Sequence, residues 1–449
     1  MNLAHAIARF TTALDAGSIP AEVREKTRTC LLNAYGMALD GHATPYAPVA
    51  RRTALAMDGE MAGGATLLGD GRTTTIGGAC LANAALFHGR AQEDTCGAAH
   101  FGTILIPLLT ALLEARRYPA TRLIPSLVAG YEAGGLLERA FAGFTTPAGF
   151  RSSAVYGVIA AAAAAARMME LSEAQTASAL GNAVSLTGGV LQSFADGTDE
   201  WRYQVGHAGR TGLLAAELAR NGSVSAPHAF EGKSGLARAF ARQDCDVAEL
   251  AGRLGRDWAM FRVAFKPYPV CAFNQTPVTA ALALREELAG AVLAEVRVRM
   301  NPYETGYAGM DATGPFGSIS GTLMSIPFCI ATTLLRGVPD MARMTTYDDP
   351  EVAALIGRIR LVPDTSVPVL SSIIEVETAD HRRVVREQRM TAADYGYDRA
   401  TVSALVRRIG GEESVPPAAF DAIEDFVARL PDAPIRQVVD AFALLPQPM

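Results

Sequence analysis

Apolar residues recur with helical spacing through roughly the first 260 positions of the chain, and glycine or proline residues separate the apolar stretches. This spacing predicts helices at residues 21–39, 78–87, 104–115, 123–141, 154–169, 172–185 and 209–220. Several of these helices consist almost entirely of Ala, Gly and Leu, and such small side chains let helix axes approach closely. The pattern therefore predicts a tightly packed bundle whose helices are buried on most faces.

The pattern changes after residue 265. Apolar and charged residues alternate at residues 294–300 with the two-residue period of a half-buried strand. Further elements follow from the same criteria: a helix at 275–288, strands at 359–362, 372–378 and 382–388, and helices at 402–409, 420–430 and 435–444. The last two strands are joined by a polar turn, which predicts a hairpin.

Together these patterns predict a fold that is mostly α with an α+β part. Residues 1–265 and 400–449 are expected to form a large helical domain, and residues 266–399 a smaller α+β domain inserted into it. The crevice between the two parts is the default position for a ligand site.

Composition supports more than one structural part. The chain has 449 residues, whereas a single core rarely grows beyond roughly 250–300 residues. Hydrophobic residues make up 49% and charged residues 19%, and this apolar surplus predicts a subunit interface. The net charge is −6, without a basic cluster that could follow a phosphate backbone, so nucleic acid is not an expected partner.

Neither a membrane segment nor a metal site is predicted. Arg9 interrupts the apolar amino terminus, which therefore does not resemble a signal peptide, and the most apolar stretch, residues 155–166, is too short to span a bilayer. The six cysteines are scattered without CxxC or CxxH spacing, which argues against a zinc site or a disulfide framework. A reducing, cytoplasmic location is expected.

Residues 88–102, HGRAQEDTCGAAHFG, concentrate polar groups between two predicted helices. One interpretation is that residues 93–95 cap the following helix. The other is that His88, His100 and a neighbouring acid border a pocket, where imidazole groups suit proton transfer. The spacing matches no familiar metal-binding pattern.

Three further segments carry candidate residues. Arg151 in GFRSS stands just before a very apolar helix, where a guanidinium fits an anion better than the helix dipole, and this predicts carboxylate binding. Residues 201–210, WRYQVGHAGR, offer Arg202 and His207, or alternatively form only a solvated helix entrance. In FKPYPVCAFN two prolines fix the chain beside Lys266, which is expected to serve as a base.

These segments resemble the MmgE/PrpD family, whose members include 2-methylcitrate dehydratase, cis-aconitate decarboxylase and iminodisuccinate epimerase. The most specific matches are FKPYPVCAFN at 265–274, GHAGRTGLLAAELA at 206–219, MELSEAQTASALGNAVSLTGG at 169–189 and the EDT element at 93–102. The resemblance implies a helical domain with an inserted α+β domain, a homodimer, a small polycarboxylate substrate, and no cofactor or metal.

Three positions depart from the family pattern. Ala91 replaces the first acid of a DxDDT-like motif, Arg151 replaces a histidine, and Gln204 replaces a lysine. These departures favour an isomerase, a cofactor-independent epimerase that inverts a Cα of iminodisuccinate by two-base proton transfer. The alternative is a lyase of the 2-methylcitrate dehydratase or cis-aconitate decarboxylase type, favoured by the retained Lys266, Thr95 and His100. A binding protein without catalysis is a third hypothesis.

The resemblance also suggests residue roles. Lys266 is expected to act on one face of the substrate, and His100 or Tyr303 on the other. Tyr303 follows a predicted strand, and its alternative interpretation is a packed aromatic ring. The expected substrate-binding residues are Arg151, Arg90, Arg202, Tyr156, Thr95 and His207.

Overall fold

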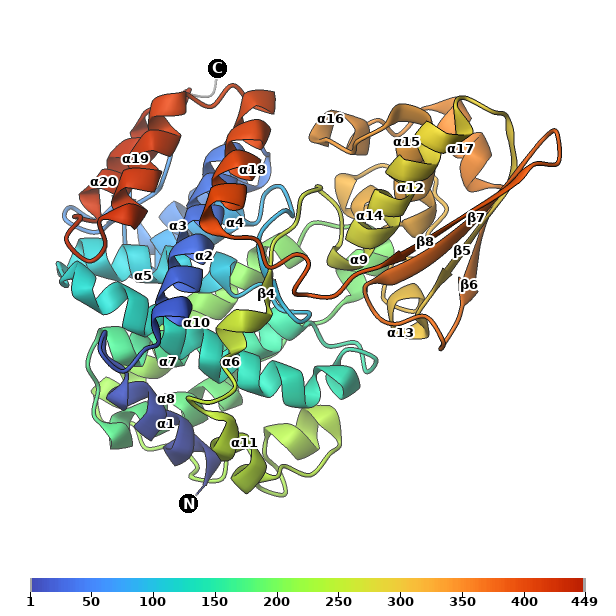
Figure 1. Cartoon of the computed structure of the whole chain (residues 1–449). Helices are drawn as coiled ribbons and strands as arrows, with labels where there is room; N and C mark the ends of the chain where they lie inside the picture. Colours follow the sequence, from blue (N-terminus) through green and yellow to red (C-terminus); the bar gives the residue numbers. More distant parts are fainter. Residues whose placement is uncertain (1, 447–449) are drawn as a thin grey trace. The chain divides into compact units, whose positions relative to one another are not determined.

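The computed structural model describes residues 2–446, and the chain divides into two compact units (Figure 1). The first comprises the residues up to Val190, Arg202–Phe265, and the residues from Gly396 onward, and the second comprises Leu191–Trp201 and Lys266–Tyr395. The predicted fold class, mostly α with an α+β part, is confirmed. In the described part of the chain no helix is both long enough and apolar enough to cross a membrane.

Helices build the first unit. They are α1 (Leu3–Ala13), α2 (Ala21–Asp40), α3 (Tyr46–Asp58), α4 (Ile76–Phe87), α5 (Gly102–Arg116), α6 (Leu123–Thr145), α7 (Ser152–Met168), α8 (Glu173–Leu186), α10 (Trp201–Arg220), α11 (Val247–Arg253), α18 (Arg399–Glu412), α19 (Pro417–Ala428) and α20 (Arg436–Ala443). Shorter turns are η1 (Ala120–Arg122), η2 (Ala237–Ala241) and η3 (Ala259–Arg262). Two small antiparallel pairs join β1 (Ala65–Thr66) to β2 (Thr73–Thr74) and β3 (Thr95–Cys96) to β4 (Val263–Ala264).

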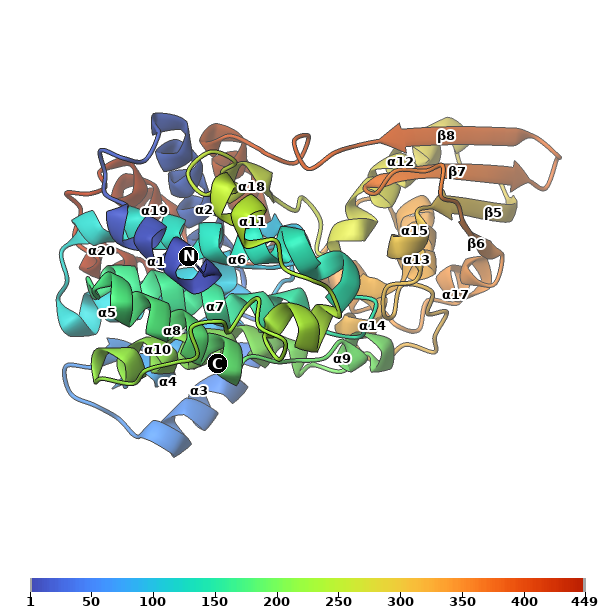
Figure 2. The ribbon, with the colours of Figure 1, turned by 90° about the horizontal axis from the view of Figure 1, so that it is seen from below.

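Small side chains explain the close packing at the centre of this unit. Helices α6 and α7 lie side by side (Figure 2), and an added Cβ at Gly134 would come within 2.8 Å of the Ala160 side chain. At Gly130 an added Cβ would meet the Ala160 carbonyl oxygen at 3.0 Å. The Ala- and Gly-rich pattern thus encodes the short distance between these two helices.

The C-terminal helices belong to the same core as the N-terminal ones. Helices α18 and α19 pack on α2, where an added Cβ at Gly36 would lie 2.5 Å from the Val406 side chain. One continuous set of buried apolar residues runs from Leu3 to Leu445. The return of helical spacing after residue 399 therefore marks the return of the chain to the first unit.

The second unit combines a sheet with helices. Its strands are β5 (Leu293–Met300), β6 (Ile359–Pro363), β7 (Ser371–Thr378) and β8 (Arg383–Arg389), in the order β6-β5-β7-β8. Strand β6 is parallel to β5, and the other pairs are antiparallel. Its helices are α9 (Gln192–Asp196), η4 (Ala272–Asn274), α12 (Gln275–Leu288), α13 (Pro302–Thr305), α14 (Ile319–Met324), α15 (Ile326–Arg336), α16 (Met341–Met344) and α17 (Pro350–Ile356).

The predicted bounds of these four strands agree with the observed bounds to within one residue at each end. Val296, Val298 and Met300 of β5 are buried, while Arg297 between them is exposed, because successive side chains of a strand point to opposite faces. Helix α12 packs on β7 and β8 (Figure 1). One face of the sheet is thereby covered.

The observed division of the chain differs from the predicted one at residues 191–201, which the sequence assigned to the helical domain. They pack in the second unit through Phe194, whose ring lies 5.2 Å from that of Trp201 and 6.1 Å from that of Tyr307. The Trp201 indole N–H also donates to Ser320 Oγ at 3.0 Å. Residues 191–201 belong to the second unit because of the contacts that Phe194 and Trp201 make in the fold. The spacing of apolar residues along the sequence carries no information on such contacts.

Candidate functional site

A largely buried segment between α4 and α5 carries three of the nine predicted site residues, namely Arg90, Thr95 and His100, together with His88 and Glu93. It begins at His88, runs through β3, and ends where α5 begins at Gly102. Phe101 is the N-cap residue of α5 and makes no side-chain cap. The capping interpretation of residues 93–95 is therefore wrong, because a strand and a turn separate them from the helix.

The carboxylate of Glu93 lies between two histidines. Its Oε2 is 3.2 Å from Nδ1 of His88, and its Oε1 is 3.1 Å from Nδ1 of His100. The two imidazole rings are 5.3 Å apart between centroids. Glu93 and His88 are buried, whereas 16% of the His100 side chain is exposed. One carboxylate thus orients two rings, and His100 is the one with an accessible edge.

Arg151 and burial determine the charge of His88. The Nη2 of Arg151 lies 2.8 Å from Nε2 of His88. A guanidinium can only donate, so Nε2 accepts and the ring hydrogen is on Nδ1, facing Glu93. Burial lowers the pKa of His88 to about 4, although Glu93 opposes this shift. His88 is therefore neutral near pH 7 and supports Arg151 and Glu93 instead of donating a proton.

Hydrogen bonds also fix the tautomer of His100. Its Nδ1 lies 3.0 Å from the main-chain oxygen of Asp94, and its backbone N–H donates to Ser153 Oγ at 3.0 Å. A carbonyl oxygen only accepts, so Nδ1 carries a hydrogen and, in the neutral ring, Nε2 carries the lone pair. Proton exchange with a substrate is therefore a property of Nε2.

Arg151 contacts one of the other unusual positions. It is buried at the N-terminus of α7, and its Nη1 donates to Oε1 of Gln204 on α10 at 3.1 Å. The family resemblance implied a histidine and a lysine at these two positions. A lysine at position 204 would set a second cation beside Arg151, whereas glutamine supplies an acceptor. The two positions that depart from the expected family pattern are thus in direct hydrogen-bonded contact.

Arg202 holds the backbone where the segment begins. Its Nη1 donates to the main-chain oxygens of His88 and Gly89 at 2.8 and 2.7 Å, and its guanidinium lies 3.8 Å from the Tyr46 ring centroid. It was predicted to bind substrate, and its observed contacts are with the protein.

Arg90, another predicted substrate-binding residue, links the segment to the end of α18. It is buried, donates to Gln92 Oε1 at 3.0 Å, and forms ion pairs with Glu412 at 2.8 Å and with Glu413. Its charge is thus already matched by two carboxylates of the protein. The spacing of the segment did not reveal partners that lie more than 300 residues away in the sequence.

The other substrate-binding candidates have different surroundings. Thr95 is buried in β3, where it pairs with Ala264 of β4. Tyr156 is buried in α7, with its hydroxyl 2.8 Å from that of Thr145. His207 is exposed on α10. The roles of these three residues in substrate binding stay predictions.

Lys266 and Tyr303 belong to the second unit. Lys266 is buried and follows Phe265, the residue after β4. Tyr303 is the second residue of α13, where its N–H donates to Asn301 Oδ1 at 3.0 Å, and its ring packs edge-on against Phe273 at 5.8 Å between centroids. This environment matches the packed-aromatic alternative for Tyr303. The catalytic roles of both residues stay predictions.

The sequence analysis placed His88, His100 and a neighbouring acid at a pocket, but it named neither His88 nor Glu93 among the expected catalytic or substrate-binding residues. It treated Gln204 only as the loss of a lysine. A left-handed turn at Ala91, with φ of 59°, helps to bring His88 and Glu93 together. Spacing along the chain does not reveal such a turn. The available signal was the presence of two histidines and an acid within a single short segment.

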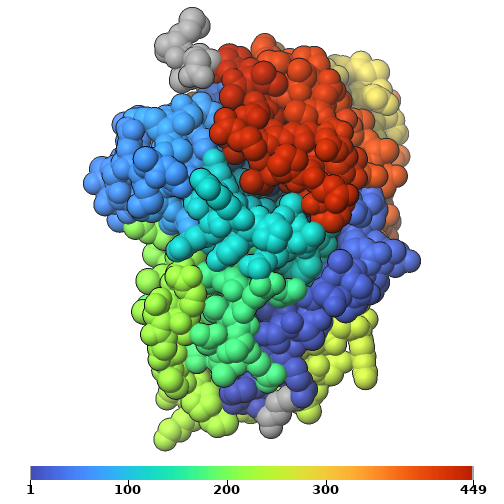
Figure 3. Space-filling model, turned by 90° about the vertical axis from the view of Figure 1, so that its left-hand side faces the viewer, coloured from blue at the N-terminus to red at the C-terminus, as the bar shows by residue number. Residues whose placement is uncertain are grey.

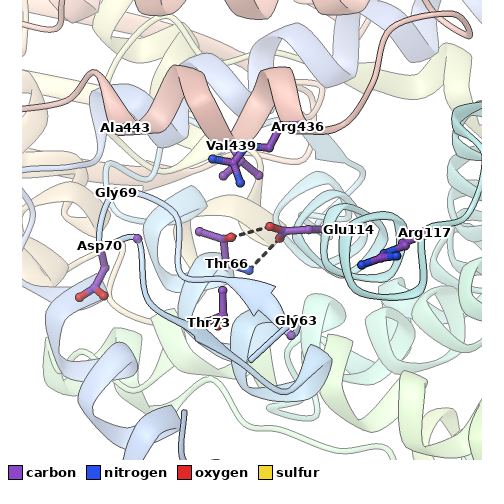
Figure 4. A pocket seen from close by; sticks show the side chains of 12 residues that line it. Gly63, Thr66, Gly69, Asp70, Thr73, Glu114, Arg117, Arg436, Val439 and Ala443 are labelled. Atoms are coloured by element: carbon purple, nitrogen blue, oxygen red, sulfur yellow. Dashed lines mark hydrogen bonds between the residues drawn. The ribbon is translucent and has the colours of Figure 1, made fainter. Parts of the chain in front are cut away.

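A cavity of about 370 Å³ opens on the first unit, where the β1–β2 hairpin, the end of α5 and one face of α20 meet (Figures 3 and 4). Glu114 points toward Thr66 and accepts from its amide and hydroxyl groups at 2.7 and 2.5 Å (Figure 4). Arg117 and Arg436 balance the charges of Glu114 and Asp70 in the lining. None of the predicted site residues lines this cavity, and its balanced charge does not favour a polyanion.

The buried carboxyl group of Glu132, in α6, should make the stability of the folded protein depend on pH. It accepts from the N–H groups of Ala259 and Met260 at 2.9 and 3.1 Å, and burial raises its pKa from 4.5 to about 7. The folded state then binds more protons than the unfolded state between these pH values, so stability falls as pH rises through this window. Thermal unfolding at pH 5 and 7.5 should show a loss on the order of 2–3 kcal/mol in the wild type. Glu132→Gln should remove most of this pH dependence, and an unchanged dependence would contradict the assignment to Glu132.

Comparison with known proteins gives two family matches. Residues 5–247 match the MmgE/PrpD N-terminal domain, and residues 268–403 match the MmgE/PrpD C-terminal domain. The two matches together cover most of the sequence.

Similar proteins of known name are lyases. The cis-aconitate decarboxylase-like protein oryM of Aspergillus oryzae is 27% identical over 281 residues, which are 59% of this chain and 58% of that protein. A cis-aconitate decarboxylase of Aspergillus terreus is 25% identical over 379 residues, which are 79% of this chain and 76% of that protein. The expectation of an isomerase is wrong, because these relatives are named as decarboxylases.

Proposed function

Because the chain belongs to the MmgE/PrpD family, we propose that it is a lyase acting on a small polycarboxylate, with decarboxylation of cis-aconitate as its reaction. The observation that carries this proposal is the cluster of Arg151, His88, Glu93 and His100, which combines a buried cation with an accessible imidazole. The names of the relatives supply the substrate class.

The reaction needs a cation and one proton. Loss of CO₂ breaks the bond between the departing carboxylate and the saturated carbon, and the bonding pair forms a new C=C bond. The pair of the old double bond moves to the far carbon, where the attached carboxylate delocalises it. Adding one proton to this carbon completes a methylene dicarboxylate product. Preorganised cations lower the barrier by stabilising the charge that develops on the retained carboxylate.

We assign the proton to His100 and the charge stabilisation to Arg151. In its protonated form His100 donates from Nε2, while Glu93 and the Asp94 carbonyl stabilise the charged ring from the Nδ1 side. Arg151 offers a planar guanidinium that suits a carboxylate. Neutral His88 supports this assignment, because it accepts from Arg151 without adding a second charge.

Lys266 is proposed as the alternative donor of this one proton, on the basis of its sequence context and burial. The chain contains only three lysines, at positions 26, 233 and 266, while arginine supplies nearly all other cations. An arginine does not give up its proton in proteins, whereas a buried lysine can. The presence of a lysine at a buried position in an arginine-rich chain therefore favours proton transfer over simple charge.

The test is incubation of the purified full chain with cis-aconitate in deuterated buffer. We expect CO₂ release and a dicarboxylate product that carries one solvent deuterium for each CO₂ lost, measured by mass spectrometry and NMR. A hydroxylated tricarboxylate serves as the comparison substrate. Dehydration of that substrate without CO₂ release from cis-aconitate would replace decarboxylation by the dehydratase reaction of the family. Turnover of neither would refute the proposed lyase.

Arg151→Lys tests the carboxylate clamp. The variant keeps a positive charge but loses the planar fork, so we expect KM to rise about 10- to 100-fold, as for loss of a charge-assisted contact of roughly 1.5–3 kcal/mol. Steady-state kinetics with cis-aconitate measure this change. Arg139→Lys is the matched control, because Arg139 is exposed and pairs with Asp257 on the surface. An unchanged KM in Arg151→Lys would remove Arg151 from substrate binding.

A further inference from the structure

A fully buried tyrosine, Tyr131, is connected to His100 through Asp94. The hydroxyl of Tyr131, in α6, donates to Oδ2 of Asp94 at 2.5 Å. Asp94 is also buried, and its main-chain oxygen is the acceptor for Nδ1 of His100 at 3.0 Å. Asp94 therefore accepts one hydrogen bond from Tyr131 through its side chain and one from His100 through its main-chain oxygen.

The buried charge of Asp94 has compensation. Lys26 of α2 lies with its Nζ 4.4 Å from the Phe265 ring centroid, and attraction to Asp94 partly opposes the lowering of its pKa by burial. Burial raises the pKa of Tyr131 well above its ordinary value, and the negative charge of Asp94 adds to this shift. Tyr131 therefore keeps its hydrogen and remains a donor to Asp94.

The surrounding backbone leaves room for this contact only because residue 102 is glycine. An added Cβ at Gly102 would lie 2.2 Å from Oδ1 of Asp94 and 3.0 Å from the Tyr131 hydroxyl. The buried Asp94 side chain is held by Tyr131 and has little freedom to move aside. The start of α5 is thus shaped around the Tyr131–Asp94 hydrogen bond.

We propose that Tyr131 is a positioning residue for His100, acting through Asp94 to hold the imidazole in the tautomer with hydrogen on Nδ1. The hydrogen bond anchors the Asp94 side chain, and this anchor fixes the direction of the Asp94 carbonyl toward His100. Glu93 is the preceding residue, so its carboxylate is held against Nδ1 of His100 by the same stretch of backbone. The catalytic meaning of this arrangement rests on the proposed function, whereas the tautomer itself does not.

The test replaces Tyr131 by phenylalanine in the full chain with ¹⁵N-labelled histidine. In the wild type the neutral His100 ring should give NMR shifts of a single Nδ1–H tautomer, assigned by comparison with His100→Gln. In Tyr131→Phe we expect a mixture of tautomers and, with cis-aconitate, a kcat about 10-fold lower at nearly unchanged KM. A single unchanged tautomer in Tyr131→Phe would overturn the proposal.

Tyr35→Phe is the matched control. Tyr35 is also fully buried, and its hydroxyl lies 2.7 Å from that of Thr110, so the substitution removes a comparable buried hydrogen bond. It should lower Tm by a similar amount while leaving the His100 tautomer unchanged, and a tautomer change here would also overturn the proposal.

Gly102→Ala, which crowds Asp94 with both tyrosines intact, should reproduce the tautomer mixture. An altered tautomer without any turnover of cis-aconitate would support the positioning role and count only against the proposed reaction.

Discussion

Replacing His100 by glutamine is expected to lower kcat for cis-aconitate decarboxylation by about 10²- to 10⁴-fold, the range typical for loss of a general acid. Glutamine keeps an amide group that can hydrogen-bond to Glu93, so the cluster should stay assembled. The glutamine amide is too weak an acid to protonate carbon, so the far carbon of the old double bond would have to take its proton from water. We therefore expect KM and Tm to change little.

The control is His228→Gln, since 68% of the His228 side chain is exposed and its contact is with Glu231 on the surface. A His100 variant that retains wild-type kcat would transfer the proton-donor role to another group.

The sequence predicted the elements well where burial is periodic. Strand β5 was located because apolar and charged residues alternate along it, and alternation directly reports which face is buried. Strands β7 and β8 were located with the help of the polar turn between them. The Ala- and Gly-rich helices, like β5, were located from the periodic spacing of apolar residues. Short elements such as β3 and β4 were missed, because two residues carry no measurable period.

The site could be predicted only in part. The segment around His100 and the position of Arg151 were identified, since both concentrate polar groups beside apolar helices. The partners of Arg90 and Arg202 could not be, because Glu412 lies far along the chain and main-chain oxygens have no sequence signal. A buried arginine that binds substrate and one that holds its own backbone look alike in sequence.

The inference of altered chemistry failed for a related reason. The absence of the family's histidine and lysine at positions 151 and 204 was taken as lost catalytic groups, which favoured an isomerase. In the structure Arg151 donates a hydrogen bond to Gln204, so these two positions are in contact and are not independent of one another. Two substitutions at contacting positions count as one change, and the sequence alone could not show that they touch.

The second large effect is expected at Lys266. If Lys266 transfers a proton, then Lys266→Ala should lower kcat by about 10²- to 10⁴-fold. Lys266→Arg should be almost as impaired, because arginine keeps the charge but does not release a proton in proteins. Lys233→Ala is the control, since Lys233 is exposed.

The arginine variant separates proton transfer from charge. If Lys266 only attracts a substrate carboxylate, arginine should preserve most of kcat and alanine should act mainly by raising KM. That result would make Lys266 a binding residue and leave His100 as the proton donor. Because Lys266 is buried, both variants need a thermal unfolding measurement, so that a kcat loss is assigned to chemistry only where Tm is retained. Loss of kcat in both variants, with Tm and KM close to those of the wild type, is the outcome that proton transfer by Lys266 requires.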